Sequence, residues 1–253
     1  TEFIVSSIQY SVFSKQYSKP VTEHRILDTE YWILNTPALI LYELPLFPLD
    51  TVLFPGMPLP LHIFEERYKA MIADCIRDGR PFGVVLIAEG AAEGGPPATP
   101  HAIGCTAEVV QVQPLEEGRM LIVTIGRERF RIVRLQRAEP YLIGMVEPVP
   151  LLDEDEEQLA ESAARLGPLV SQYLDKLAQL GHMAARPDAP PDDPTALAYL
   201  GAALIQLPPE QKQALLSLDR VTELSAALRR VYRGELALMQ TMPSGDIGLF
   251  SLN

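Results

Sequence analysis

The sequence has few cysteines and no long apolar run, and both shortages limit what the protein can be. The two cysteines, Cys75 and Cys105, form no CxxC pair. Two buried, reduced thiols are favoured, and a disulfide between them stays open as the alternative. No uninterrupted apolar stretch approaches the roughly 20 residues that span a bilayer. No basic-then-apolar signal peptide opens the chain. We therefore expect a cytoplasmic protein with no membrane partner.

Positive charge is also scarce. The chain has 21 Lys and Arg against 33 Asp and Glu, which gives a formal net charge of −12. Nucleic acids and anionic membranes attract basic surfaces, so this balance argues against sequence-independent binding of DNA, RNA or membrane. The apolar fraction of 47% is ordinary for a globular chain with a substantial core.

Motifs for catalysis and for metal or cofactor binding are missing. There is no GxxxxGK[ST] loop for nucleotide phosphates, no GxSxG and no HExxH. The 4 histidines are scattered. The acidic run Asp153–Glu157 lacks the glycine and the spacing of a calcium loop. We therefore expect no enzyme activity, no catalytic residue, no metal site and no cofactor.

What the sequence does contain is a stretch at 44–68 in which prolines separate large apolar residues. It reads LPLFPLDTVLFPGMPLPLHIFEERY. Pro55-Gly56 suits a tight turn, because proline presets φ and glycine accepts a positive φ. Beyond the turn, the apolar residues at 59, 61 and 63 are spaced as on the buried face of a strand. Pro58 and Pro60 cannot donate to a sheet ladder, so we expect this strand at a sheet edge.

A helix is expected directly after this edge strand. From Tyr68, apolar residues recur every four positions through Ile72 and Ile76. Glu65 and Glu66 fall in the first turn, where the helix dipole favours negative charge, and a glycine at 79 is a suitable stop. The stretch therefore predicts strand, turn, edge strand and helix start.

The rest of the chain divides into a strand-rich part and a helix-rich part. Further strand patterns lie at 82–87, 103–112, 120–125, 127–135 and 141–146. They predict a small curved sheet or pseudo-barrel of about six strands with one helix. Apolar residues recur at spacings of four and three over 159–180 and predict a long amphipathic helix, which Gly167-Pro168 should kink or split. Further helices are predicted at about 195–206, 209–217 and 220–241, the first of them capped by Asp193-Pro194. The fold class is therefore α+β.

These patterns divide the chain into four segments. We expect an extension at 1–42, a β-rich subdomain at 43–150, a helical subdomain at 151–242 and a tail at 243–253. The Pro- and acid-rich join at 148–157 is expected to be an exposed linker. The loop at 88–101, rich in Gly, Pro and Ala, is expected to be mobile.

Several segments in a fixed order also resemble a family. The stretch at 44–68 is followed by FGVVL, IGCTAEVVQV, GRERFRI and YLIGMVE, at 82–86, 103–112, 126–132 and 141–147. Weaker helical matches follow at 193–219 and 228–236. Together they are similar to the N-terminal, substrate-binding domain of Lon proteases, over roughly residues 43–240. Several matched segments in order are stronger than any single motif. The extension at 1–42 lies outside this match.

The resemblance implies a non-enzymatic module that binds unfolded or extended polypeptides. It also implies an adaptor linked to proteolysis, with a protease or a chaperone as a further partner. Because the motifs of the Lon ATPase and Ser–Lys protease modules are missing, we expect a stand-alone form. Two alternatives stay open. One is an enzyme or small-molecule binder that uses the cleft between subdomains, and the other is an RNA binder, by analogy with the PUA-like barrel.

The first candidate site is a peptide-binding surface where the edge strand meets the helix. Its members are Phe54, Met57, Phe64, Glu65, Glu66, Arg67 and Tyr68. Prolines leave the edge poorly paired, aromatic and thioether side chains adapt to apolar ligands, and the charged residues give a polar rim. The alternative is that the apolar members are ordinary core residues.

The second candidate site is a row of arginines. Arg127, Arg129 and Arg131 alternate with Phe130 and Ile132, so the arginines share one face of a strand. They form an anion or partner patch in one interpretation. In the other, which is favoured, they are the solvated face of an amphipathic strand.

Overall fold

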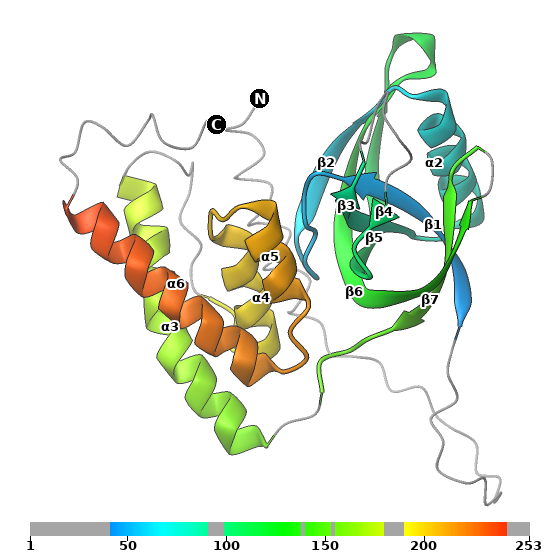
Figure 1. Ribbon diagram of the computed structural model, residues 1–253. Coiled ribbons are helices and arrows are strands. Elements are labelled where there is room, and N and C mark those ends of the chain that lie inside the picture. Colours follow the sequence, from blue (N-terminus) through cyan, green and yellow to red (C-terminus); the bar gives the residue numbers. More distant parts are fainter. Residues whose placement is uncertain (1–40, 91–98, 138–139, 153–154, 180–189, 242–253) are drawn as a thin grey trace, which may run out of the picture.

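The computed structural model describes residues 41–90, 99–137, 140–152, 155–179 and 190–241 (Figure 1). The expectations for the N-terminal extension, for the tail and for most of the loop at 88–101 fall outside these residues. The two parts expected from the sequence are both present in the described chain. We refer to residues 42–148 as the β subdomain and to residues 156–241 as the helical subdomain.

The β subdomain contains seven strands, one helix and a short 3-10 turn. They are β1 (Tyr42–Leu49), β2 (Pro58–Ile63), α2 (Glu66–Asp78), β3 (Phe82–Glu89), β4 (Thr99–Pro100), β5 (Ile103–Pro114), η1 (Glu116–Gly118), β6 (Met120–Arg137) and β7 (Leu142–Pro148). The helical subdomain contains α3 (Glu156–Gln179), α4 (Pro194–Leu204), α5 (Pro209–Leu216) and α6 (Val221–Thr241). The expected α+β fold is confirmed.

The sheet closes on itself. Its strand order is β1-β7-β6-β5-β3-β4, and an additional parallel pairing of β1 with β3 joins the two sides. The inside is packed with buried apolar side chains such as Leu46, Val85 and Phe130. The expected pseudo-barrel is therefore present, and strands such as β1 and β3 are buried on both faces, with one face in the cluster of Phe130 and the other in the cluster that packs against α2.

The sequence predicted two strands at 120–125 and 127–135, whereas the structure has the single strand β6. The strand bends instead of ending, because its pairings shift register next to Gly126 and again near Val133. Gly126 lies so close to the preceding turn that an added Cβ would fall 2.2 Å from the carbonyl oxygen of Phe54. The glycine therefore marks a close approach of two backbone segments and not a strand end.

Helix α2 covers one face of the sheet, with its apolar side turned inward. Tyr68, Met71, Ile72 and Cys75 are buried. The helix ends at Gly79, whose φ of 61° is the left-handed conformation that glycine adopts without strain. The expected helix start and stop are both confirmed. The helix stop also sets where β3 begins, three residues later.

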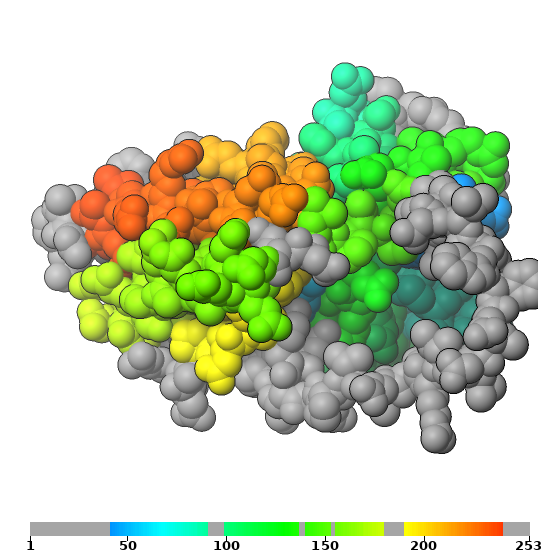
Figure 2. Space-filling view, turned by 90° about the horizontal axis from the view of Figure 1, so that it is seen from below, coloured from blue at the N-terminus to red at the C-terminus, as the bar shows by residue number. Residues whose placement is uncertain are grey.

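In the helical subdomain α3 and α6 lie side by side (Figure 2). The first helix is not split at Gly167-Pro168, which was one of the two expected outcomes, because α3 runs through Pro168. Proline removes only one ladder hydrogen bond, and the buried side chains of α3 keep the helix packed on both sides of it. The expected cap of α4 is present, since the Ala196 N–H donates to Asp193 Oδ2 at 2.6 Å.

Candidate functional site

Three strand segments form an arm that extends beyond the closed barrel. We call residues 58–63 of β2, 108–114 of β5 and 120–125 of β6 the arm (Figure 1). β6 is its central strand. β2 pairs with β6 alone, and β3 pairs with β5 only as far as Ala107, opposite Phe82. Within the described chain, both outer edges of the arm are therefore without a neighbouring strand.

The register shows which backbone groups face these edges. Pro58 and Pro60 have no N–H to give to β6, so they take the positions whose backbone groups point away from it. Leu59 then faces β6, opposite Thr124, whose hydroxyl also donates to the Leu59 carbonyl at 3.0 Å. The edge of β2 consequently has no N–H at residues 58 and 60.

The same alternation continues across β6 to β5. Residues 121, 123 and 125 of β6 face β5, opposite Gln113, Gln111 and Glu108. An extra residue at 110 is taken up by a register shift between Val109 and Gln111. The backbone groups of Val109 and Val112 therefore face the open edge. No proline lies between 108 and 113, so both residues present an N–H as well as a carbonyl there.

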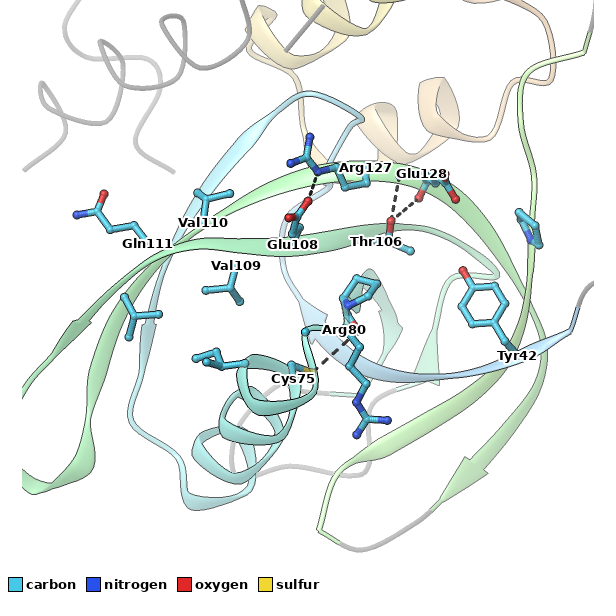
Figure 3. Close-up of a pocket in the computed structure, with 15 residues that line it drawn as sticks. Tyr42, Cys75, Arg80, Thr106, Glu108, Val109, Val110, Gln111, Arg127 and Glu128 are labelled. Atoms are coloured by element: carbon cyan, nitrogen blue, oxygen red, sulfur yellow. Dashed lines mark hydrogen bonds and ion pairs between the residues drawn. The ribbon is translucent and has the colours of Figure 1, made fainter. Parts of the chain in front are cut away.

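A groove of about 760 Å³ follows this open edge of β5 (Figure 3). The end of α2 forms the opposite wall, with Ile76 and Arg80, and Tyr42 lies at one end. Val109 points to the α2 side of β5 and Val110 to the other side. Ile76, Val110 and Val112 are exposed apolar residues, so the groove offers apolar contacts next to unpaired backbone.

Polar residues on the groove are paired within the chain. Arg127 forms an ion pair with Glu108 at 2.5 Å, and the Thr106 hydroxyl accepts from the Glu128 N–H at 3.0 Å. Cys75 also lines the groove, but burial raises the pKa of its thiol to about 11, so it is protonated near neutral pH. A protonated thiol is a poor nucleophile.

The structure separates the residues of the predicted peptide-binding surface. Phe54 is 0% exposed and packs with the helical subdomain, and Tyr68 is 5% exposed and stacks on Phe47. For these two the alternative interpretation as core residues holds. Met57 is half-buried between the cores of the two subdomains. None of the three presents its side chain as a free contact surface.

The other members of that surface are accessible. Phe64 is 45% exposed, and its ring lies 5.5 Å from that of His62, opposite the exposed Leu121. We call His62, Phe64 and Leu121 the Phe64 patch. Beside it, Glu65 pairs with Arg67 at 2.8 Å, and Glu66 pairs with a lysine one turn later at 2.6 Å. The predicted polar rim is thus made of ion pairs.

The arginine row does not form a continuous basic surface. Arg129 is only 4% exposed, and its guanidinium donates to backbone carbonyls of the helical subdomain and of residues 149–150, which join the two subdomains. Nη1 reaches Leu216 at 2.7 Å and also Leu218, Nε reaches Val149 at 3.1 Å, and Nη2 reaches Pro150 at 3.4 Å. Arg131 is paired with Glu147 at 3.0 Å, as Arg127 is with Glu108. Arg129 is therefore a structural residue, because α5 docks on its face of β6.

The open edge of β5 is the feature that the sequence analysis missed. The strand at 103–112 was expected, and its register against 82–87 was not. One signal was available, since VVQVQ has no proline or glycine to block an edge, unlike PLPLH in β2. Gln213 was missed as well. It is buried, and its Nε2 donates to the Ile103 carbonyl at 3.0 Å, which adds a second link between the subdomains.

The described residues contain neither a candidate membrane-spanning helix nor a cluster of metal ligands. No helix among them is long and apolar enough to cross a bilayer. No group of three or more His, Cys, Asp or Glu side chains in the same residues is placed to hold a metal ion.

Comparison with known sequences gives a consistent result. The sequence model of the ATP-dependent protease La (LON) substrate-binding domain matches residues 43–230. The chain is 31% identical over 175 residues to Lon protease 2 of Myxococcus xanthus, which covers 68% of this chain and 21% of the relative. It is 30% identical over 190 residues to the Lon protease of Anaeromyxobacter dehalogenans, which covers 74% and 22%. The chain thus spans about a fifth of the length of these relatives.

Comparison with solved structures agrees. A Lon N-terminal domain protein from Xanthomonas campestris superposes with a TM-score of 0.52 at 27% identity, covering 80% of this chain and 99% of the other. The N-terminal domain of the Mycobacterium avium complex Lon protease superposes with a TM-score of 0.58, covering 76% and 98%. At 21% identity, this second likeness shows a shared fold.

Proposed function

The chain belongs to the ATP-dependent protease La (LON) substrate-binding domain family, and from this premise we propose that it binds unfolded or extended polypeptides without catalysing a reaction on them. The matched family is the substrate-binding domain and not the ATPase or protease module. The observation that carries the proposal is the Phe64 patch. An aromatic ring that is 45% exposed beside a second ring and a leucine is the kind of surface that binds apolar side chains.

The surroundings of the patch support reversible binding. The ion pair between Glu65 and Arg67 and the neighbouring Glu66 give it a charged rim, which is typical of surfaces that bind and release a partner. Phe54 and Tyr68 are core residues, in the turn that precedes β2 and in the first turns of α2, and are not part of the patch. In this revised form, the peptide-binding surface predicted from the sequence is kept as Phe64 with its charged neighbours.

We extend the proposal to the role of the bound polypeptide. The relatives are proteases by name, so we propose that this domain delivers polypeptides to proteolysis, with an ATP-dependent protease or a chaperone as partner. Two buried, unpaired thiols at Cys75 and Cys105 fit a reducing compartment, which supports the cytoplasmic placement expected from the sequence.

The alternatives have less support. The space between the subdomains is filled by buried residues such as Phe54 and by the carbonyl contacts of Arg129, which disfavours a cleft for a small molecule. An RNA site needs a continuous basic surface, whereas Arg127 and Arg131 are each paired with a glutamate.

The test is a titration of the full chain with fluorescently labelled α-lactalbumin, both native and after reduction and carboxymethylation. We expect binding to the unfolded form alone. Phe64→Ala should weaken it about fivefold to tenfold, because a single aromatic anchor contributes on the order of 1–1.5 kcal/mol. Leu152→Ala, which removes another exposed apolar side chain outside the patch, is the matched control and should bind as the wild type does.

Circular dichroism melts of both variants must match the wild type for the comparison to count. Equal affinity of the wild type for folded and unfolded lactalbumin would contradict polypeptide recognition. Unchanged affinity of Phe64→Ala at an unchanged melting temperature would remove the Phe64 patch as the contact surface.

A further inference from the structure

We propose that the polypeptide docks on the open edge of β5 by adding an extended segment as a further strand beside Val109 and Val112. This inference rests on the proposed function and names the mode of binding and the class of segment that is bound. The groove of about 760 Å³ along β5 is the space that the added strand would occupy.

The two edges of the arm differ in what they offer an incoming backbone. An added strand needs both donors and acceptors at alternate positions of the edge that it joins. On β2, Pro58 and Pro60 occupy two of the three outward positions and leave their carbonyls without a neighbouring donor, so His62 alone has an outward N–H. On β5, Val109 and Val112 face outward and each has its N–H. Within the described residues, strand addition is therefore disfavoured along most of β2 and open on β5.

The length of the open edge fits a short extended segment. β3 ends its pairing with β5 at Ala107, so the free edge runs from Glu108 to Gln113. At about 3.3 Å per residue this is roughly 20 Å. Pro81, which comes directly before β3, lines the groove, and proline cannot supply the N–H that would prolong the pairing from within the chain.

The side chains around this edge specify the class of segment. Alternate residues of an added strand point to opposite faces. One face would lie toward Val109 and toward Ile76 at the end of α2, and the other toward the ion pair of Glu108 and Arg127. The preferred ligand is therefore a segment of alternating apolar and polar residues, with no proline where it must donate to β5.

The first test is Val112→Pro, which places a proline at an outward position of β5, as Pro58 and Pro60 are placed on β2. It removes one outward N–H, while Gln111 and Gln113 keep their pairing with β6. Affinity for unfolded lactalbumin should fall about tenfold, as expected for one lost backbone hydrogen bond together with the obstruction by the ring. Val112→Ala keeps the N–H and trims the side chain, and it should bind within about threefold of the wild type. Equal losses in the two variants would overturn strand addition.

The second test uses the wild-type chain, so it holds even where Val112→Pro disturbs folding. The probes are ten-residue peptides of alternating valine and threonine with terminal lysines, N-methylated either at every valine or at every threonine. In a docked strand, the N–H groups of alternate residues point to opposite edges, and only those on the edge away from β5 can carry a methyl group without loss of binding. One methylated peptide should therefore bind as the unmethylated peptide does, and the affinity of the other should fall at least tenfold. Equal binding of both would contradict the proposal.

The outcomes separate this inference from the proposed function. If the wild type binds unfolded lactalbumin while Val112→Pro and N-methylation have no effect, only the docking mode fails. If the wild type does not bind unfolded lactalbumin at all, the proposed function fails. Self-association of the wild type that competes with the peptide and is lost in Val112→Pro would assign the edge to a second copy of the chain, and would overturn the proposal.

Discussion

The subdomain interface and the arm both contain backbone groups that have no partner in a helix or a strand pair. The two regions differ in whether side chains satisfy these groups. At the interface, carbonyls at the end of α5 accept from buried Arg129, and the carbonyl of Ile103 accepts from Gln213. At the arm, Val109 and Val112 face an edge with no neighbouring strand in the described chain. The first region satisfies its own backbone, and the second has no neighbouring strand in the described chain, as the proposed docking of a polypeptide requires.

The difference follows from which side chains reach each region. Arg129 donates to four carbonyls, and the carbonyls of Leu216 and Leu218 lie at the negative end of the α5 dipole. A buried cation is stable there because every contact is a charge-assisted hydrogen bond. The side chains of Val109 and Val112 carry no donor or acceptor, so they cannot satisfy the backbone groups of their own edge. The side chains at each place therefore decide whether the backbone groups find a partner within the chain.

The largest expected effect comes from breaking the closed region. Arg129→Met keeps an apolar stem and removes the donors, so the carbonyls of α5 and of residues 149–150 lose their partners. We expect the free energy of unfolding to fall by about 3 kcal/mol, measured by urea denaturation. Arg127→Met on the same strand removes an ion pair with an exposed carboxylate and should change it by less than about 1 kcal/mol. Equal losses would show that Arg129 does not hold the subdomains together.

The next prediction, with a smaller expected effect, concerns Cys75. This residue lines the groove along the open edge of β5, but its own thiol is buried. The pKa of Cys75 is raised from 9.0 to about 11 by burial. Because the thiolate is the reactive form, alkylation of Cys75 at pH 8 should be about a hundredfold slower than for an exposed thiol. The alkylation rate of Cys75 should rise about tenfold for each pH unit up to about pH 11. The measurement is iodoacetamide labelling followed by peptide mass spectrometry.

The control for this prediction is the same labelling in urea, where Cys75 should react at the ordinary rate. The raised pKa also has a consequence for stability. The folded state favours the protonated thiol, so its contribution is complete below pH 9 and is lost as the pH rises through about 11. Fast labelling of the folded chain at pH 8 would contradict the burial of this residue.

The smallest expected effect comes from opening the blocked edge. Pro60→Val restores an outward N–H on β2 and makes that edge resemble the edge of β5. We expect calorimetric titration with the alternating peptide to show a second, weaker site, with the affinity of the first site changed by less than about twofold. A stoichiometry that stays at one peptide per chain would show that the prolines are not what blocks this edge.

Local signals in the sequence predicted much of the fold. Pro55-Gly56 gave the turn, Pro58 and Pro60 gave the edge strand, and Asp193-Pro194 gave the start of α4. Each of these signals acts within a few residues of its effect, so one sequence is enough to interpret it. The resemblance of 44–68 and the later segments supplied the family, which the comparisons confirmed.

The features that decide the candidate site depend on tertiary contacts, and local patterns do not contain them. Period two placed Arg127, Arg129 and Arg131 on one face, and nothing nearby in the sequence shows that α5 covers the middle one. Phe54 and Tyr68 have the composition of surface anchors and of core residues alike, and only their packing distinguishes the two. The open edge of β5 arises because β3 begins at Phe82 and meets β5 no further than Ala107.

Hydrogen–deuterium exchange of the full chain with and without unfolded lactalbumin tests the central claim most directly. The account predicts that binding slows exchange in peptides that cover 108–113, because the amides of Val109 and Val112 gain carbonyl partners. Exchange in 58–61 should not change, since the outward positions at 58 and 60 carry no N–H. Protection confined to 58–64, or unchanged exchange in 108–113 at saturating lactalbumin, would contradict docking on the edge of β5.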